Sequence, residues 1–190
     1  MTKTKHLKSK ICLVGEKAVG KTSLIRRYVM NTFDEQYLTT IGTRVSKKEV
    51  HVLLPEHDVL VDVDMTIWDI MGEKGFRELL KEAYFYGANG ILAVADITRR
   101  RSLDDLDDWI DGVEQLVGKV PILLAVNKTD LTSGVQFSER DVAQFAKAYE
   151  CDFFLTSAKT GNQVEDTFRR IGRLVAERSE ERRVGKECRL

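Results

Sequence analysis

Apolar and polar positions change their period several times along the chain, and each change marks a predicted element. Residues 10–14 form a short apolar run typical of a buried strand, and residues 20–31 place apolar side chains on one side of a helix. Residues 44–54 and 60–68 then alternate between apolar and polar side chains, as half-buried strands do. Because turn-forming residues 55–58 separate them, these two stretches predict an antiparallel hairpin.

The rest of the chain alternates between helical and strand-like patterns. Strands are predicted at residues 90–95, 120–126 and 152–156, and helices at residues 102–117, 138–149 and 163–176. Ser102 is expected to cap the helix that follows it. This order predicts an α/β fold with a mostly parallel six-stranded sheet, one antiparallel hairpin edge and helices on both faces. Ligands of such sheets bind beyond the carboxyl ends of the strands.

Length and composition indicate a single globular domain. The chain has 190 residues, of which 43% are hydrophobic, and it carries 30 basic and 30 acidic side chains. This balance gives no electrostatic footprint for nucleic acid, and no apolar run is long enough for a membrane span. Three cysteines and three histidines show no zinc-site spacing, and no signal peptide is visible. We therefore expect a cytoplasmic monomer with reduced thiols.

The two ends of the chain differ from its middle. Residues 1–9 are expected to form a flexible basic N-terminus, although such lysine-rich segments can also contact anionic lipid. Residues 178–188 match, residue for residue, the translation of a DNA string that resembles a common sequencing-adapter read. Our hypothesis is that they are an assembly artefact, and the alternative is an ordinary charged helical extension. Resequencing the gene tests this hypothesis, and until then the true C-terminus and any lipid anchor stay open.

A glycine-rich motif lies between the first predicted strand and the first predicted helix. Residues 15–22 match G-x-x-x-x-G-K-[ST] at every fixed position. Glycines allow a loop to approach phosphate oxygens closely with its backbone N–H groups, and the helix adds its positive N-terminus. We expect Lys21 to reach the β- and γ-phosphates and Thr22 to supply a hydroxyl ligand to Mg²⁺.

Four further motifs follow, at residues 37–42, 69–72, 127–130 and 157–159. With the glycine-rich motif they make the chain similar to a small GTPase of the Ras superfamily, nearest the Rab branch and its prokaryotic relatives. The resemblance implies a P-loop NTPase fold with a G domain at residues 10–177. It also implies GTP and GDP as ligands, with Mg²⁺.

The first two of these motifs have roles in the phosphate half of the site. The resemblance assigns Thr40 to Mg²⁺ and the γ-phosphate, and Phe33 to stacking on guanine. The Asp69 carboxylate can hold Mg²⁺ through water. The Gly72 N–H can meet the γ-phosphate and move when it leaves, which is a physical basis for a switch.

The last two motifs recognise the base. Asp130 can accept hydrogen bonds from the N1–H and the exocyclic amine of guanine, a pair that adenine lacks. Asn127 is expected to bridge to the glycine-rich loop, Lys128 to lie along the base, and Ala158 to donate its N–H to guanine O6. The nucleotide-binding residues implied in this way are Gly15, Glu16, Lys17, Ala18, Val19, Gly20, Lys21, Thr22, Ser23, Phe33, Thr40, Gly72, Asn127, Lys128, Asp130, Ser157, Ala158 and Lys159.

Three residues depart from the family pattern. Glu73 replaces the glutamine that orients the attacking water, and a carboxylate cannot donate a hydrogen bond as an amide can. Met71 replaces a small alanine. Lys17 stands where glycine or serine is frequent, and it could pair with Glu73, lend charge to the phosphates, or turn to solvent. The expected metal ligands are Thr22, Thr40 and Asp69, and the expected catalytic residues are Glu73, Lys21 and Thr40.

The leading interpretation is a slow Mg²⁺-dependent GTPase that acts as a molecular switch. Effectors are expected to read residues 32–44 and 69–84, and an exchange factor and a GTPase-activating protein are further expected partners. One alternative is a GTP-binding interaction module with negligible hydrolysis. Another is a P-loop ATPase or nucleotide kinase, which leaves residues 127–130 unexplained. Membrane contact through a partner remains open.

Overall fold

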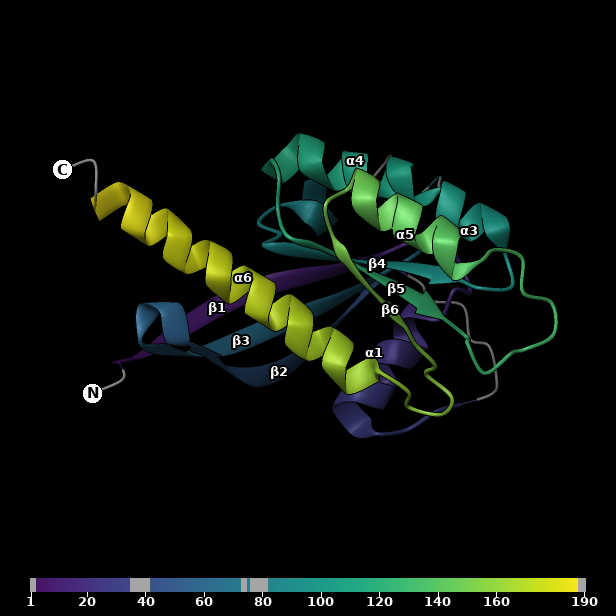
Figure 1. Cartoon of the computed structure of the whole chain (residues 1–190), viewed down its shortest axis with the longest axis horizontal. Helices are drawn as coiled ribbons and strands as arrows, with labels where there is room; N and C mark the ends of the chain where they lie inside the picture. The colour runs from purple at the N-terminus through teal and green to yellow at the C-terminus, as the bar shows by residue number, and fades with distance from the viewer. Residues whose placement is uncertain (1–2, 35–41, 73–74, 76–81, 188–190) are drawn as a thin grey trace.

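Helices and strands alternate around one sheet (Figure 1). The structure is a computed structural model, and it describes residues 3–34, 42–72, 75 and 82–187. Within these ranges the strands are β1 (Lys3–Val14), β2 (Thr43–Leu54), β3 (Val59–Ile70), β4 (Gly90–Asp96), β5 (Ile122–Asn127) and β6 (Asp152–Leu155). The helices are α1 (Lys21–Met30), α3 (Arg100–Asp104), α4 (Leu106–Val117), α5 (Glu139–Ala148) and α6 (Val164–Glu187), with a 3-10 turn η1 (Pro55–His57).

The sheet has the predicted topology. Its strand order is β2-β3-β1-β4-β5-β6; β2 and β3 are antiparallel, and the other neighbouring pairs are parallel. The hairpin pairs Thr43 with Ile70 at one end and Leu54 with Val59 at the other. The α/β fold with one antiparallel hairpin edge is therefore confirmed. The carboxyl ends of the five parallel strands meet at one edge of the sheet.

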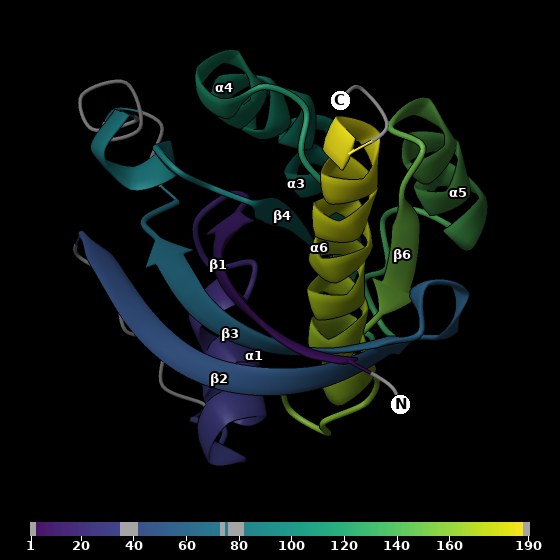
Figure 2. The same ribbon diagram turned by 90° about the vertical axis from the view of Figure 1, so that its left-hand side faces the viewer.

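Helices cover both faces of the sheet, as predicted. Successive side chains of a strand point to opposite faces, so Ile11 packs in the cluster that holds α1 and α6 while Cys12 packs in the cluster that holds α3, α4 and α5. Figure 2 shows α6 on one side of the sheet, with α4 and α5 beyond the other. The rings of Tyr28 and Phe168 stack with centroids 4.2 Å apart, which anchors α1 on α6.

The expectation of a flexible N-terminus is wrong for residues 3–9. These residues form the first part of β1 and pair with β3 from Lys3 opposite Val59 onwards. The segment between Thr4 and Lys10 contains a single large apolar residue, Leu7, so its side chains gave no clear strand signal. Backbone hydrogen bonding to the long β3 supplies the stabilisation that side-chain pattern does not reveal.

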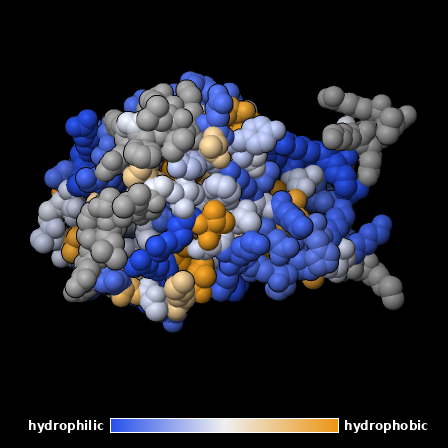
Figure 3. Space-filling view, turned by 180° about the vertical axis from the view of Figure 1, so that it is seen from behind, coloured by the Kyte–Doolittle hydropathy of each residue, from blue (hydrophilic) through white to orange (hydrophobic). Residues whose placement is uncertain are grey.

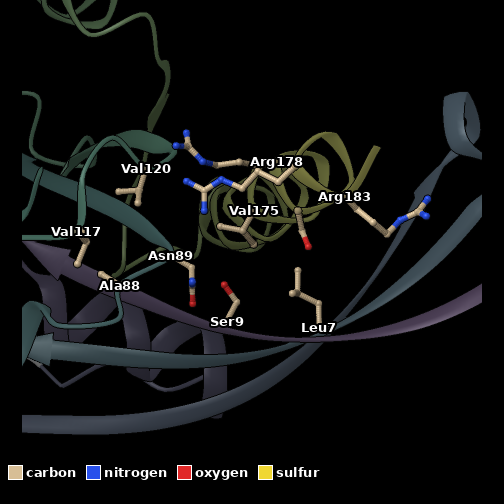
Figure 4. Close-up of a pocket in the computed structure, with 11 residues that line it drawn as sticks. Leu7, Ser9, Ala88, Asn89, Val117, Val120, Val175, Arg178 and Arg183 are labelled. Carbon is tan, nitrogen blue, oxygen red and sulfur yellow. The ribbon is translucent and has the colours of Figure 1, made fainter. Parts of the chain in front are cut away.

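Helix α6 continues past its predicted end at residue 176. Glu180 is 4% exposed and accepts a hydrogen bond of 2.7 Å from Lys5 Nζ. A cavity of about 370 Å³ lies between this part of α6 and β1 (Figure 4), with Arg178 and Arg183 on its wall. This geometry is that of a charged helical extension. The origin of residues 178–190 stays a hypothesis, so the cavity carries no functional assignment.

Two serines near helix starts behave differently. Ser138 and Asp141 form a capping box at the start of α5. Ser102 does not cap a helix, because α3 already begins at Arg100; its Oγ instead accepts the Asp96 N–H at 2.8 Å and holds the turn after β4.

No helix in the described part of the chain is both long and apolar enough to cross a bilayer.

Candidate functional site

The phosphate loop, residues 15–20, joins β1 to α1 at the carboxyl edge of the sheet. Its backbone is left-handed at Gly15 (φ 135°) and Gly20 (φ 102°). A side chain at Gly15 would overlap the Val94 carbonyl, and one at Gly20 would overlap the Asn127 side-chain amide. Both positions therefore require glycine for their backbone conformation and for close approach to neighbouring strands.

Lys21 supplies a buried positive charge at this loop. The residue is 6% exposed, and its Nζ donates to the carbonyl oxygens of Gly15 and Glu16, each at 2.7 Å. Burial lowers the pKa of Lys21 to about 8, although the negative charge of Asp69 acts to raise it. The ammonium therefore stays charged at neutral pH, and an ammonium has three hydrogens that it can donate to acceptor oxygens.

Thr22 and Asp69 lie together beside Lys21. Thr22 Oγ1 donates to Asp69 Oδ2 at 2.5 Å. Asp69 is 1% exposed, and its Oδ1 has no hydrogen-bond partner among the described residues. Burial raises the pKa of Asp69, while the Thr22 hydrogen bond and the Lys21 charge lower it. A buried carboxylate oxygen without a partner, next to a hydroxyl, fits a hard cation such as Mg²⁺.

Gly72 lies directly against the phosphate loop. A side chain at this position would overlap backbone atoms of Glu16 and Lys17. The segment after β3 thus passes the loop at backbone contact distance. Only glycine fits there, which gives a steric reason for the glycine of the motif at residues 69–72.

Asn127 connects the motif at residues 127–130 to the phosphate loop. Its side chain is buried at the end of β5, and its Nδ2 donates to the Val19 carbonyl at 3.0 Å. Its Oδ1 accepts the Ala158 N–H at 3.1 Å. One amide therefore holds together the three loops that follow β1, β5 and β6.

Asp130 and the motif at residues 157–159 form the outer end of the site. Ser157 is buried, and its Oγ donates to Asp130 Oδ1 at 2.6 Å. The same Oγ accepts the Thr160 N–H at 3.1 Å. Each carboxylate oxygen has two acceptor positions, so Asp130 keeps capacity for a ligand that carries two adjacent N–H groups.

Sequence comparisons place the chain among known proteins. The model of the Ras family matches residues 10–177. The chain belongs to the Ras family. Ras-related protein Rab-13 of Canis lupus familiaris is 30% identical over 177 residues, which are 93% of this chain and 84% of the relative. The Homo sapiens proteins Rab-36 and Rab-17 are each 33% identical over 90% of this chain, which covers 63% and 78% of them. This member of the Ras family is a Rab-like small GTPase.

The described contacts do not test the predicted role of every site residue of this Rab-like GTPase. Thr40 and Glu73 lie outside the described residues. Phe33 is half-buried and packs against the α1–α6 cluster, and Met71 is buried. The positions of Ser23, in the first turn of α1, and Lys159, which is exposed, leave their predicted ligand contacts as predictions.

Arg27 is a site residue of the GTPase that sequence reasoning missed. It projects from α1 to the motif at residues 157–159, where its Nε donates to the Ala158 carbonyl at 2.8 Å and its Nη2 to the Lys159 carbonyl at 2.6 Å. The helix that begins at the phosphate loop is thereby tied to the loop expected to meet guanine. Its helical spacing gave no signal, because arginine at such a position ordinarily faces solvent.

Arg99 and Asp96 form a second missed connection. Arg99 Nη2 donates to the Lys17 carbonyl at 2.7 Å, and its Nε lies 3.3 Å from Asp96 Oδ2. Lys128 Nζ donates to the same carboxylate oxygen at 2.6 Å and to the Ala18 carbonyl at 2.7 Å. Burial alone would raise the pKa of Asp96. The hydrogen bond from Lys128 helps to keep this pKa below its usual value. Two cations, Arg99 and Lys128, thus donate to carbonyl oxygens of the phosphate loop while they share the buried Asp96 carboxylate.

Replacing Arg27 with alanine should speed the release of GDP. The substitution removes the two hydrogen bonds from the charged guanidinium to the loop at residues 157–159. Each is worth about 1.5 kcal/mol or more, so we expect a roughly 10-fold to 100-fold faster dissociation. Release of a fluorescent GDP analogue measures it. Arg169→Ala, which removes an exposed ion pair with Glu165 on α6, is the matched control. An unchanged rate in Arg27→Ala would contradict the assigned role.

Proposed function

We propose that this Rab-like GTPase binds GTP and GDP with Mg²⁺ at the carboxyl edge of the sheet and hydrolyses GTP to GDP and phosphate. The observation that carries the proposal is the 3.0 Å hydrogen bond from Asn127 Nδ2 to the Val19 carbonyl. It fixes the expected base-reading loop against the phosphate loop. A ligand with a base at one end and phosphates at the other therefore meets a site whose two ends have a set separation.

The phosphate end of the site stabilises negative charge. The backbone N–H groups after Gly15 and the N-terminus of α1 favour anions, and Lys21 adds a cation that is already shielded from water. Mg²⁺, held by Thr22 and Asp69, would neutralise charge on the β- and γ-phosphate oxygens. Such catalysis depends on positioning and electrostatics, so it needs no nucleophilic side chain.

The base end of the site favours guanine. Asp130 presents a carboxylate whose Oδ1 is already oriented by Ser157, and guanine offers it two donors where adenine offers none in that arrangement. Displacement of a bound fluorescent guanine nucleotide by GTP, compared with its displacement by ATP, tests this choice. Equal competition by ATP would support the P-loop ATPase or kinase interpretation instead.

The switch is proposed to act through the segment that includes Gly72. Because Gly72 already lies at backbone contact with Glu16 and Lys17, a γ-phosphate beside the loop would meet its N–H or displace the segment. Effectors are proposed to read residues 32–44 and 69–84. Exchange factor and activating protein, like a cytoplasmic location with membrane contact through a partner, remain predictions.

Single-turnover hydrolysis of γ-labelled GTP by the full chain with Mg²⁺ separates a GTPase from a binding module. We expect turnover that depends on Mg²⁺ and changes in Glu73→Gln and Lys17→Gly, because both substitutions alter charge at the position expected for the γ-phosphate. Glu150→Gln, at an exposed turn beside α5, is the matched control for Glu73→Gln. Tight GTP binding without turnover in the parent, restored by Glu73→Gln, would make the protein a binding module instead.

A further inference from the structure

A row of three ionisable side chains crosses the sheet far from the nucleotide site. In the strand register, Asp62 of β3 lies directly between His6 of β1 and His51 of β2. Val50 and Val52, the neighbours of His51 in β2, are buried on the face of the sheet that packs against α6, so the His51 side chain points to the opposite face. Figure 3 shows the molecule from behind Figure 1, and mostly hydrophilic side chains cover the half that carries the two termini.

Asp62 contacts both histidines of this row. His51 Nδ1 lies 2.7 Å from Asp62 Oδ1, and His6 Nδ1 lies 3.6 Å from Asp62 Oδ2. Ligand atoms of Glu49, His51 and Asp62 all lie within 4.8 Å of one another, close enough to share one ion, and His6 lies outside this group. The Asp62 side chain is 14% exposed, whereas those of His6 and His51 are 75% and 66% exposed. The carboxylate is therefore sheltered between two accessible imidazoles.

We propose that His6, His51, Asp62 and Glu49 form a binding site for a divalent transition-metal ion of the zinc class. Two imidazole nitrogens with carboxylate oxygens are a donor set that Zn²⁺, Ni²⁺ and Cu²⁺ accept, whereas Mg²⁺ and Ca²⁺ prefer oxygen alone. Ligand atoms around a tetrahedral zinc ion are about 3.3 Å apart, because each lies about 2.0 Å from the metal. Ligand atoms of Glu49, His51 and Asp62 already lie within 4.8 Å of one another, and the proposal requires the exposed side chain of His6 to rotate toward them from its position beside Asp62.

The pattern of histidines along the sequence does not indicate this site. His6 and His51 are 45 positions apart by their residue numbers, and only the pairing of β1 and β2 with β3 brings them into one row. The consequence of binding is a link across three strands that ties the start of β1 to the hairpin. The site is at the end of β1 opposite the phosphate loop, so its occupancy does not depend on the nucleotide chemistry.

Titration of the GDP-loaded full chain with ZnCl₂, in the presence of excess Mg²⁺, tests the proposal by calorimetry. Excess Mg²⁺ with GDP keeps the expected magnesium ligands occupied, so the heat reports the new site. We expect one zinc ion per chain, and affinity lower by roughly 10-fold or more in His51→Ala and in Asp62→Asn. His57→Ala is the matched control, since His57 is the remaining histidine and lies in η1 outside the row.

A second measurement identifies the ligands directly. Electron paramagnetic resonance of the Cu²⁺-loaded protein should show two coordinated imidazole nitrogens in the parent and one in His6→Ala. Retained GDP binding in each variant shows that it is folded. Absence of zinc binding by the parent, or zinc binding unchanged in His51→Ala and Asp62→Asn, would overturn the proposal and leave a simple cross-strand ion pair.

Discussion

Replacing Lys21 with alanine should abolish tight binding of GTP and GDP. The Lys21 ammonium donates to the carbonyl oxygens of Gly15 and Glu16, and these bonds hold it at the phosphate loop. Loss of a preorganised cation that makes two or more charge-assisted hydrogen bonds should weaken affinity by roughly 100-fold or more. Equilibrium titration with a fluorescent GDP analogue measures the change.

The same substitution should leave the nucleotide-free fold intact. Burial of the Lys21 ammonium is unfavourable, as its lowered pKa indicates, so its removal takes away a destabilising charge as well as two hydrogen bonds. We therefore expect the melting temperature without nucleotide to stay the same or rise, while added GDP no longer raises it. Lys147→Ala, at an exposed position on α5, should behave as the parent does. A variant that melts much earlier without nucleotide would show that Lys21 is chiefly a structural residue.

Nucleotide affinity should fall as the pH rises above about 8, the pKa to which burial lowers Lys21. Phosphates favour the charged form, so the pKa of Lys21 is higher in the complex than in the free protein. Between the two values binding takes up a proton, and each step to higher pH weakens it. Affinity measured on both sides of the free-protein pKa should show this loss in the parent and in Lys147→Ala. Affinity that is level across this range would contradict the assignment of the phosphate contact to Lys21.

The layout of the sheet could be predicted because its signals are local. Apolar runs and alternation marked all six strands, and the turn at residues 55–58 marked the hairpin. The part of β1 between Lys3 and Ser9 could not be predicted in this way. Its side chains are mostly polar, and it is held by backbone pairing with a strand more than fifty positions away in the sequence.

The candidate site shows the same division between local and tertiary information. The motifs indicated Lys21 and Asn127 because spacing within each loop is enough to define them. Arg27 and Arg99 act on carbonyl oxygens of loops distant in sequence, so no spacing rule identifies them. The pairing of Thr22 with Asp69 was predicted through a shared metal, and the structure adds the buried Asp69 oxygen that lacks a partner among the described residues.

Replacing Asp130 with asparagine should change the preferred base from guanine to xanthine. In the parent both Asp130 oxygens are acceptors, which match the N1–H and exocyclic amine of guanine. Asparagine keeps one acceptor and replaces the other with an NH₂ donor. This donor would face the exocyclic amine of guanine, which is also a donor, so no hydrogen bond can form there. Xanthine carries a carbonyl at that position, so the altered pair fits it. We expect GTP affinity to fall by roughly 100-fold or more, with a gain for the xanthine nucleotide.

The Ser157 hydrogen bond makes this substitution a selective test of base recognition. Ser157 Oγ donates to Asp130 Oδ1 at 2.6 Å, and the asparagine carbonyl can accept the same bond, so the loop geometry has a reason to persist. Competition of GTP and the xanthine nucleotide for the labelled site reports the preference, with Asp111→Asn on the exposed face of α4 as the matched control. Loss of both nucleotides would indicate a collapsed loop, and Ser157→Ala would then show the same loss. GTP binding left untouched by Asp130→Asn would instead mean that another residue reads the base.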